Sequence, residues 1–282
     1  MRFATIVEEG RLSVAVVRGQ ALLPLSIQDT GLGSLRAIAS SGDDGLRRVH
    51  EWVQLQPERA YRPIDDVEFG PAVPDPGAIY TIGLNYAAPD DLHDDRPERP
   101  MVYGKVPTAV TGHGSVVTWD RALTANVDAE SELGVVIGER ASAVAPEDSM
   151  RHVFGYTCVN DMSSRDPWLD GDQWLLGKSM AGFCPVGPSV VTRDEVDPAD
   201  LRLGCAINGI AIQDGRTAQM RFSVAEVIAY LSRHVVLRPG DLIATGTPAR
   251  LAGPIGPERH LQAGDVVTVW IEHIGELTTT IA

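Results

Sequence analysis

From residue 78 to its end, the chain consists mainly of short β-type runs, and this pattern limits the folds available to it more than any other feature. The runs begin with AIYTIGL at 78–84 and end with ELTTTIA at 276–282, and turn sequences such as RPGD and QAGD separate several of them. Helical patterns do not alternate with these runs, as they would in a doubly wound α/β fold. Residues 71–282 are therefore predicted to form one mostly β domain with a few short helices.

Residues 1–70 have a different pattern and are predicted to form a small α+β amino-terminal domain. FATIV, RLSVAVV and ALLPL are predicted to be short strands of a meander. Residues 44–55 are predicted to form a helix, because Leu46, Val49 and Val53 recur on one face. The stretch 62–77 is rich in Pro, Asp and Gly and is predicted to be a linker.

Two further helices are predicted within the β domain. Residues 145–153 place Pro146 in a first turn that acidic residues follow, which is typical of a helix start. Residues 223–233 begin with Ser223 and Glu226 in the spacing of a capping box, ahead of an apolar run.

Charge and cysteine content exclude several classes of protein. The net charge of −14 and the lack of basic clusters argue against a nucleic-acid or anionic-membrane partner. The amino terminus has no signal-peptide pattern, and no run approaches the ~20 apolar residues that span a bilayer, so a cytoplasmic protein is predicted. Cys158, Cys184 and Cys205 lack CxxC spacing and are expected to be buried, reduced thiols.

Two glutamates precede an apolar run in VDAESELGVVIG, residues 127–138. On a strand, side chains at i and i+2 share a face, so Glu130 and Glu132 would lie roughly 7 Å apart at Cα. A solvated edge strand is the simplest explanation of such a pair. LGVVIG is apolar at every position, however, which indicates a strand covered on both faces.

Two ionised carboxylates this close in a dry site require either a proton or a shared cation. Oxygen ligands favour a hard ion such as Mg²⁺, Mn²⁺ or Ca²⁺. Asp161, at the end of the apolar run FGYTCVND, is the best candidate for a third carboxylate. Lys178 lies between apolar and glycine residues, and is either a snorkelling surface lysine or a cation held in a pocket.

Five ordered blocks carry a family resemblance: YTIGLNYAAP, VDAESELGVVIG, FGYTCVNDMSSRD, QWLLGKSMAGFCPVGP and LRPGDLIATGTPARLAG. Together they resemble the fumarylacetoacetate hydrolase superfamily over roughly residues 78–282. The resemblance implies a mixed β-roll catalytic domain, a divalent cation and a homodimer. Many single-chain bacterial members also carry a small amino-terminal domain.

The resemblance also implies roles for individual residues. Metal ligation falls on Glu130, Glu132 and Asp161, and stabilisation of an enolate or oxyanion falls on Lys178. Thr247 would donate a hydrogen bond to the substrate carboxylate. Arg165 matches the arginine that the family places near the site. A dication bound by two oxygens of a 2-oxo acid or 1,3-diketone would act as a Lewis acid beside the ammonium group.

The sequence departs from the family pattern at four positions. Family members that hydrolyse or decarboxylate commonly carry N-Y-x-x-H-x-x-E, whose His and Glu activate water or move a proton. Here Pro89 stands at the His position and Leu92 at the Glu position. Ala181 replaces the usual aspartate after G-K-S, and Trp168 stands where many relatives place a glutamine.

Three explanations of the missing dyad remain open. His93, with Glu98 or Asp94 behind it, would take over on a shifted lid, although a solvated loop histidine is the simpler reading. The metal and Lys178 alone would suffice for enolisation, tautomerisation or dehydration. The third explanation is a non-catalytic carboxylate-binding protein. It is the least favoured, because a cluster of buried acids without a function would only destabilise the fold.

The sequence therefore predicts a divalent-metal-dependent hydrolase that cleaves a C–C bond in an acylpyruvate, 1,3-diketo or 2-oxo acid. An isomerase, tautomerase or decarboxylase of a 2-oxo acid is the first alternative, and a metal-dependent carboxylate-binding protein is the second. The expected partners are a small carboxylate substrate and a second copy of the chain.

Overall fold

Two antiparallel strands, β11 (Ser131–Ile137) and β12 (Val153–Asn160), form the centre of the fold in a computed structural model that describes residues 1–87, 97–166, 174–252 and 259–282. Every residue of both strands is buried. Small and β-branched side chains suit this position, because neighbouring strands and both faces of the sheet leave no solvated side. The prediction that LGVVIG is covered on both faces is confirmed.

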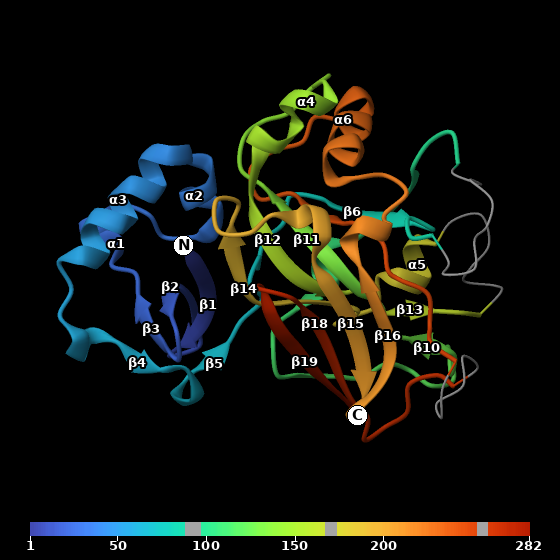
Figure 1. Ribbon diagram of the computed structural model, residues 1–282. Helices are drawn as coiled ribbons and strands as arrows, with labels where there is room; N and C mark the ends of the chain where they lie inside the picture. The colour runs from blue at the N-terminus through green and yellow to red at the C-terminus, as the bar shows by residue number, and fades with distance from the viewer. Residues whose placement is uncertain (88–96, 167–173, 253–258) are drawn as a thin grey trace.

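A long mixed sheet extends outward from this pair (Figure 1). Its strand order is β4-β3-β2-β1-β14-β12-β11-β17-β6-β7, with β5 paired to β1 and β8 paired to β14. Most pairs are antiparallel, whereas β17 pairs with β6 and β14 pairs with β8 in parallel. The other strands of this sheet are β1 (Arg2–Glu8), β2 (Arg11–Arg18), β3 (Ala21–Pro24), β4 (Arg62–Pro63), β5 (Glu68–Phe69), β6 (Ile79–Gly83), β7 (Met101–Lys105), β8 (Val110–Thr111), β14 (Cys184–Thr192) and β17 (Leu242–Ala244).

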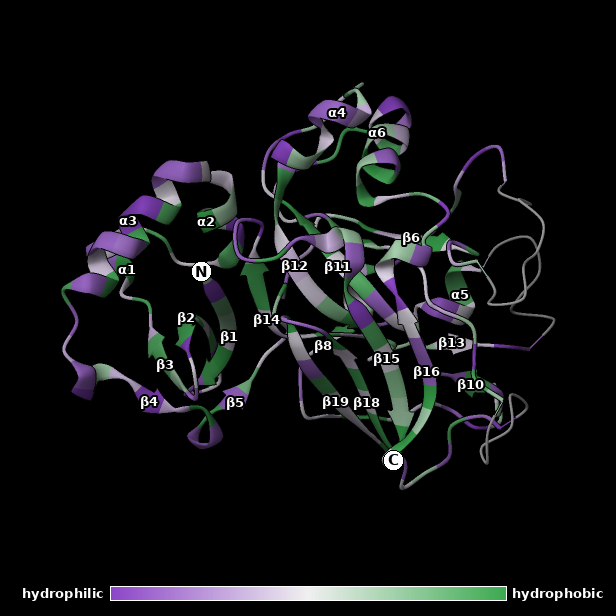
Figure 2. Cartoon of the chain, in the orientation of Figure 1, coloured by the Kyte–Doolittle hydropathy of each residue, from purple (hydrophilic) through white to green (hydrophobic). Residues whose placement is uncertain are grey.

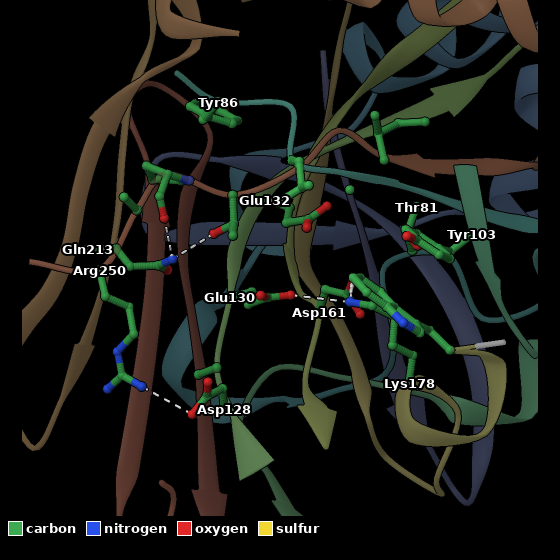
Figure 3. A pocket seen from close by; sticks show the side chains of 18 of the residues that line it. Thr81, Tyr86, Tyr103, Asp128, Glu130, Glu132, Asp161, Lys178, Gln213 and Arg250 are labelled. Atoms are coloured by element: carbon green, nitrogen blue, oxygen red, sulfur yellow. Dashed lines mark hydrogen bonds and ion pairs between the residues drawn. The ribbon is translucent and has the colours of Figure 1, made fainter. Parts of the chain in front are cut away.

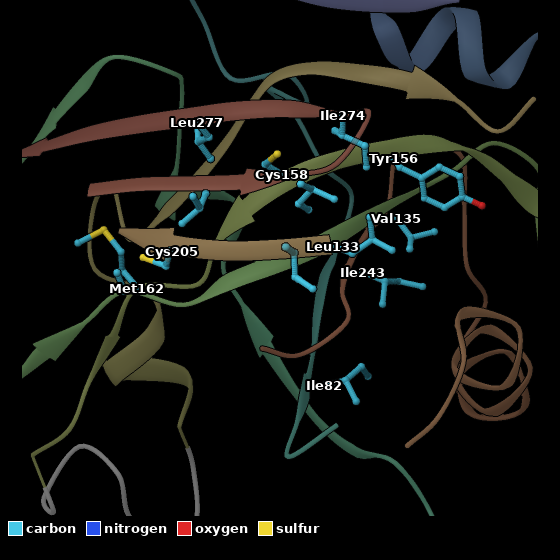
Figure 4. Close-up of a cluster of buried hydrophobic side chains, with 14 of the residues drawn as sticks. Ile82, Leu133, Val135, Tyr156, Cys158, Met162, Cys205, Ile243, Ile274 and Leu277 are labelled. Carbon is cyan, nitrogen blue, oxygen red and sulfur yellow. The ribbon is translucent and has the colours of Figure 1, made fainter. Parts of the chain in front are cut away.

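A second sheet, ordered β16-β15-β18-β19-β9, packs against the central strands. Its strands are β9 (Ser115–Val117), β15 (Arg202–Ile207), β16 (Ile210–Arg216), β18 (Val266–Ile271) and β19 (Gly275–Ile281), and a separate small ladder joins β10 (Val127–Asp128) to β13 (Ser163–Ser164). The main hydrophobic core lies between the sheets, where Leu133 and Cys158 meet Cys205 and Leu277 (Figure 4). The mostly β fold class with mixed strand pairing is confirmed.

The predicted helices are present. α3 (Gly42–Gln54) buries Val49 and is otherwise largely hydrophilic (Figure 2). Residues 145–153 form α4 (Pro146–Ser149) followed by a 3-10 turn, and α4 packs beside α6 (Val224–His234). The capping box predicted for α6 is formed by Ser223 and Glu226. Three short helices were not predicted: α1 (Ile27–Thr30), α2 (Leu35–Ser40) and α5 (Leu175–Lys178).

The first strands do not stand apart from the rest of the sheet. β1 pairs with β14 in antiparallel register, with Phe3 opposite Val190. The predicted linker at 62–77 is wrong in part, because β5 within it pairs with β1 and places Phe69 opposite Ile6. An apolar residue inside a polar stretch is enough to add a short strand there. The proposed boundary between 1–70 and 71–282 stays a prediction.

Among the strands that were not predicted, β16 is the longest. It follows β15 through Asn208 and Gly209, whose φ angles are 52° and 78°. Asn-Gly between two apolar runs is a strong hairpin signal, because both residues tolerate positive φ. The sequence carried this signal, and the polar residues of IAIQDGR obscured it.

None of the helices within the described residues has both the length and the apolar character needed to cross a membrane.

Packing between the two sheets predicts the effect of one substitution. Leu133→Ala should lower the free energy of unfolding by about 2–5 kcal/mol, because Leu133 is fully buried and its loss leaves a cavity. Urea unfolding followed by circular dichroism measures this. Leu55→Ala is the matched control, since Leu55 is 80% exposed and should change stability by less than about 0.5 kcal/mol. Equal effects of the two substitutions would contradict the packing described here.

Candidate metal centre

The register between β11 and β12 brings the predicted acids together. Ser131 lies opposite Asn160, so the start of β11 meets the end of β12. The Asp161 N–H donates to the Glu130 carbonyl oxygen at 2.9 Å, and the Glu130 N–H donates to Asn160 Oδ1 at 3.1 Å. Glu132 lies within β11, whereas Glu130 lies just before it, so the prediction that both belong to one strand is wrong for Glu130.

The three carboxylates form one cluster. Glu130, Glu132 and Asp161 each offer an oxygen, and these atoms all lie within 4.8 Å of one another. Glu132 and Asp161 are buried, and the Glu130 side chain is 14% exposed. Figure 3 shows the three side chains converging on one cavity, whose volume is about 290 Å³.

Lys178 is the buried cation that the sequence left open as one of two alternatives. It ends α5, and its side chain is 7% exposed. Its Nζ donates to Asp161 Oδ2 at 2.6 Å, to Ser163 Oγ at 2.8 Å and to Glu130 Oε2 at 3.3 Å. Burial lowers the pKa of Lys178, but the charges of Asp161 and Glu130 raise it further, so the net shift is upward and the amine stays protonated.

A second lysine, Lys105, was missed by the sequence analysis. It ends β7, its side chain is completely buried, and its Nζ donates to Asp161 Oδ1 and to the Met162 carbonyl oxygen. Lys105 and Lys178 are the only lysines in the sequence, where every other basic residue except histidine is arginine. The scarcity of lysine could have identified Lys105 as a candidate site residue. In the structure, both lysines contact Asp161.

The electrostatics of the three acids differ. Burial raises the pKa of Asp161, but Lys105 and Lys178 lower it more strongly, so the net shift is downward. Burial likewise raises the pKa of Glu130, and the charges of Lys178 and Arg165 bring it below its ordinary value. These two acids are therefore ionised and balanced by protein cations.

Glu132 is the acid that the protein does not balance. Burial, followed by the charges of Asp161 and Glu130, holds its pKa well above the ordinary value. Its Oε2 accepts a hydrogen bond from the Gly246 N–H at 2.8 Å, and within the described residues it forms no ion pair. An all-oxygen cluster with one uncompensated carboxylate suits a hard divalent cation, so these residues fit a metal of the Mg²⁺ or Mn²⁺ type.

Arg165 joins the cluster to a second group of charges. It donates to Glu130 Oε1 through one terminal nitrogen and to Asp128 Oδ2 through Nε at 3.1 Å. Asp128 Oδ1 also contacts Arg250 at 3.1 Å and His260 Nδ1 at 2.9 Å. The sequence analysis identified Arg165 and missed Asp128, Arg250 and His260.

Thr247 lines the cavity, but its hydroxyl group already has partners. Its Oγ1 donates to the Ser131 carbonyl oxygen at 2.8 Å and accepts from Gln213 Nε2 at 2.8 Å. The predicted hydrogen bond from Thr247 to a substrate carboxylate would require this hydroxyl group to turn. Aromatic side chains form another part of the cavity wall, where Tyr103 stacks on Trp174 with ring centroids 4.2 Å apart.

Several predicted positions lie outside the described residues. His93 and Asp94 are among them, as are the departures at Pro89, Leu92 and Trp168. Their predicted roles stay predictions.

Comparison with known proteins identifies the family. The model of the fumarylacetoacetate (FAA) hydrolase C-terminal family matches residues 78–282, which is most of the chain and contains the whole carboxylate cluster. The chain belongs to the fumarylacetoacetate hydrolase family. The resemblance noted in the five sequence blocks is confirmed.

Solved structures of family members match the full length of the chain. Fumarylacetoacetate hydrolase from psychrophilic Exiguobacterium antarcticum has a TM-score of 0.87 at 30% identity, covering 100% of this chain and 99% of that one. Maleylpyruvate hydrolase from Sphingobium sp. SYK-6, solved with manganese(II) and pyruvate, has a TM-score of 0.82 at 27% identity and covers 100% and 99%. A 2-hydroxyhepta-2,4-diene-1,7-dioate isomerase from Mycobacterium marinum has a TM-score of 0.77 at 28% identity and covers 100% and 98%. The family thus contains both hydrolases and isomerases, and this fold supports an enzyme.

The unbalanced charge on Glu132 predicts an effect of pH on stability. Because its pKa is higher in the folded than in the unfolded protein, ionising Glu132 destabilises the fold as the pH rises above about 4.3. Without metal at pH 7, Glu132→Gln should therefore raise the free energy of unfolding by about 1 kcal/mol or more. This difference from the wild-type protein should vanish near pH 4. Urea unfolding in EDTA at both pH values measures this.

The same pair of proteins tests metal binding. Added Mn²⁺ should raise the melting temperature of the wild-type protein and leave Glu132→Gln nearly unchanged. Equal stabilisation of the two proteins by Mn²⁺ would count against Glu132 as a ligand.

Proposed function

We propose that this chain is a divalent-metal-dependent hydrolase that cleaves a C–C bond in an acylpyruvate or a related 1,3-diketo or 2-oxo acid. The observation that carries the proposal is the convergence of Glu130, Glu132 and Asp161 with the Lys178 ammonium group in one cavity. Three carboxylates suit a hard dication, and a neighbouring fixed cation suits a substrate that develops negative charge on oxygen.

The chain's own residues divide the chemistry between them. Glu130, Glu132 and Asp161 would hold the metal, which would act as a Lewis acid on a chelated 2-oxo acid. Lys178 would stabilise the enolate that leaves when the C–C bond breaks, because its amine is held protonated within hydrogen-bond reach of the cluster. Lys105 would position Asp161 from the opposite side. Arg165 would fix the orientation of Glu130.

The Sphingobium relative supports this division. That protein is a maleylpyruvate hydrolase, and its structure contains manganese(II) together with pyruvate, a 2-oxo acid. Mg²⁺ is proposed here with Mn²⁺ and Ca²⁺ as alternatives, because the same oxygen ligands accept each of them.

An isomerase, tautomerase or decarboxylase acting on a 2-oxo acid is the second candidate. Two observations favour it: Pro89 and Leu92 replace the His and Glu that activate water in many relatives, and the Mycobacterium marinum relative is an isomerase. Such reactions need an enolate to be stabilised, which Lys178 supplies, and need no attacking water. We also propose the homodimer that the family resemblance implies and the cytoplasmic location predicted from the sequence.

The proposed reaction predicts metal-dependent turnover. The wild-type protein should remove the ultraviolet absorbance of the enol of an acylpyruvate and release pyruvate, and EDTA should abolish the reaction until Mg²⁺ or Mn²⁺ is restored. A panel of acylpyruvates and oxaloacetate, with pyruvate release assayed separately, distinguishes the candidates. Enol decay without pyruvate release would favour the isomerase. Calorimetric binding without turnover of any panel member would favour a carboxylate-binding protein.

Replacing Lys178 separates charge stabilisation from metal binding. Lys178→Met should lower kcat by about 100-fold or more, because the leaving enolate loses its fixed cation. Mn²⁺ binding measured by calorimetry should be unchanged or tighter, since one positive charge leaves the cluster. Weakened Mn²⁺ binding, or unchanged turnover, would contradict the role proposed for Lys178.

A further inference from the structure

A buried hydroxyl group in the cavity wall has no partner. Thr81 lies on β6, is 1% exposed and lines the cavity that holds the carboxylate cluster. Its Oγ1 forms no hydrogen bond within the described residues. Buried hydroxyl groups are nearly always hydrogen-bonded, so such an atom is expected to meet a ligand or a water molecule. Because Thr81 lines the cavity, that partner is expected to be a molecule bound there.

Thr81 belongs to the part of the wall that adjoins Lys178. β6 pairs with β7, where Thr81 stands opposite Tyr103, and α5, which ends at Lys178, packs on β7. Burial raises the pKa of Tyr103, and the nearby Lys178 charge opposes this rise, so the ammonium group lies close to the same wall. Figure 3 shows Thr81 and Tyr103 on the same side of the carboxylates as Lys178, with Gln213 on the other side. A negatively charged oxygen bound by Lys178 would therefore lie next to the wall that carries Thr81.

Two other hydroxyl groups in the cavity lining are poorer donors for that oxygen. Thr247 already donates to the Ser131 carbonyl oxygen, so it would have to break this bond first. The Tyr86 hydroxyl is also buried and without a partner among the described residues, and its pKa is raised by burial and by the charge of Glu132. That carboxylate would repel an anionic atom placed beside Tyr86. Thr81 instead combines an unused hydroxyl proton with a neighbouring cation.

We propose that Thr81 is a further catalytic residue, whose hydroxyl group donates a hydrogen bond to the enolate oxygen beside the Lys178 ammonium group. A donor held by a strand stabilises negative charge that develops on oxygen, because it needs little reorganisation during the reaction. The bond is stronger to the enolate than to the neutral 2-oxo acid, so it lowers the barrier more than it improves substrate binding. This inference rests on the proposed function, since it adds a residue to the same reaction.

Removing the hydroxyl group while keeping the shape of the side chain tests this role. Thr81→Val should lower kcat for an acylpyruvate by about 10- to 100-fold and change KM by less than about threefold, because the lost bond belongs mainly to the enolate. The melting temperature should not fall, since the hydroxyl group has no partner within the described residues. Thr81→Ser keeps the hydroxyl group and should restore most of the lost kcat.

Thr157→Val is the matched control. Thr157 is also fully buried, and its Oγ1 has no partner in the described part of the chain, but Thr157 does not belong to the cavity lining. This variant makes the same chemical change and should leave kcat and KM unchanged. An unchanged kcat in Thr81→Val, or an equal loss in Thr157→Val, would overturn the role of Thr81.

A binding measurement separates this inference from the proposed reaction. Calorimetry on the Mn²⁺-loaded protein compares pyruvate with oxalate, a planar dianion that resembles the enolate of pyruvate. Thr81→Val should weaken oxalate binding by about tenfold and pyruvate binding by less than about threefold, and Thr157→Val should change neither. If no acylpyruvate is cleaved but oxalate binding is weakened selectively, the reaction is wrong and the contact made by Thr81 stands. Unchanged oxalate binding in Thr81→Val, or equal weakening of both ligands, would overturn that contact.

Discussion

The structure depends on one electrostatic constraint, the convergence of three carboxylates inside a sheet. Their oxygens lie within 4.8 Å of one another, where each carboxylate has lost most of its hydration and repels the other two. The protein balances this charge unevenly. Asp161 receives both lysines of the chain and Glu130 receives Arg165, while Glu132 receives a single backbone N–H. Glu132 lines the cavity and forms no ion pair among the described residues, so the cluster is suited to bind a cation there.

The backbone around the cluster follows from the same constraint. Glu132 reaches its hydrogen bond because Gly246 brings the chain after β17 close to β11. Gly246 has φ of 97°, and a Cβ there would lie 2.7 Å from Asn85 Cβ and 2.9 Å from the Ile82 carbonyl oxygen. Only glycine satisfies both the angle and the close approach. The T-G-T-P block thus has a structural explanation that is independent of any contact between Thr247 and substrate.

Local pattern and family resemblance predicted the acids and Lys178, because these residues sit at the ends of apolar runs within recognisable blocks. The cations that come from elsewhere were not predicted. Lys105 ends β7, at the far edge of the sheet order, and reaches Asp161 across 56 positions of sequence. Arg250 reaches Asp128 across 122 positions. Pairings of this kind depend on strand order, which period and propensity do not encode. The prediction of a linker over 62–77 was wrong in part for the same reason. β5 is a strand because it pairs with β1, and its own two residues carry little strand propensity.

One family can contain both hydrolases and isomerases if the cavity in each of them serves mainly to stabilise negative charge. Lys178 stays protonated, so it is not suited to act as a base. Under the proposed function, the protonated Lys178 would favour the enolate of a 2-oxo acid over its neutral form. Cleavage of an acylpyruvate releases such an enolate, and migration of a double bond passes through one. A site built on this shared species needs only a change in the groups that deliver water or a proton to move from one reaction to the other. Under the proposed function, the His and Glu of the family pattern, replaced in this sequence by Pro89 and Leu92, would belong to the proton-handling part of the reaction, whereas Lys178 and the three carboxylates would supply the charge-stabilising part.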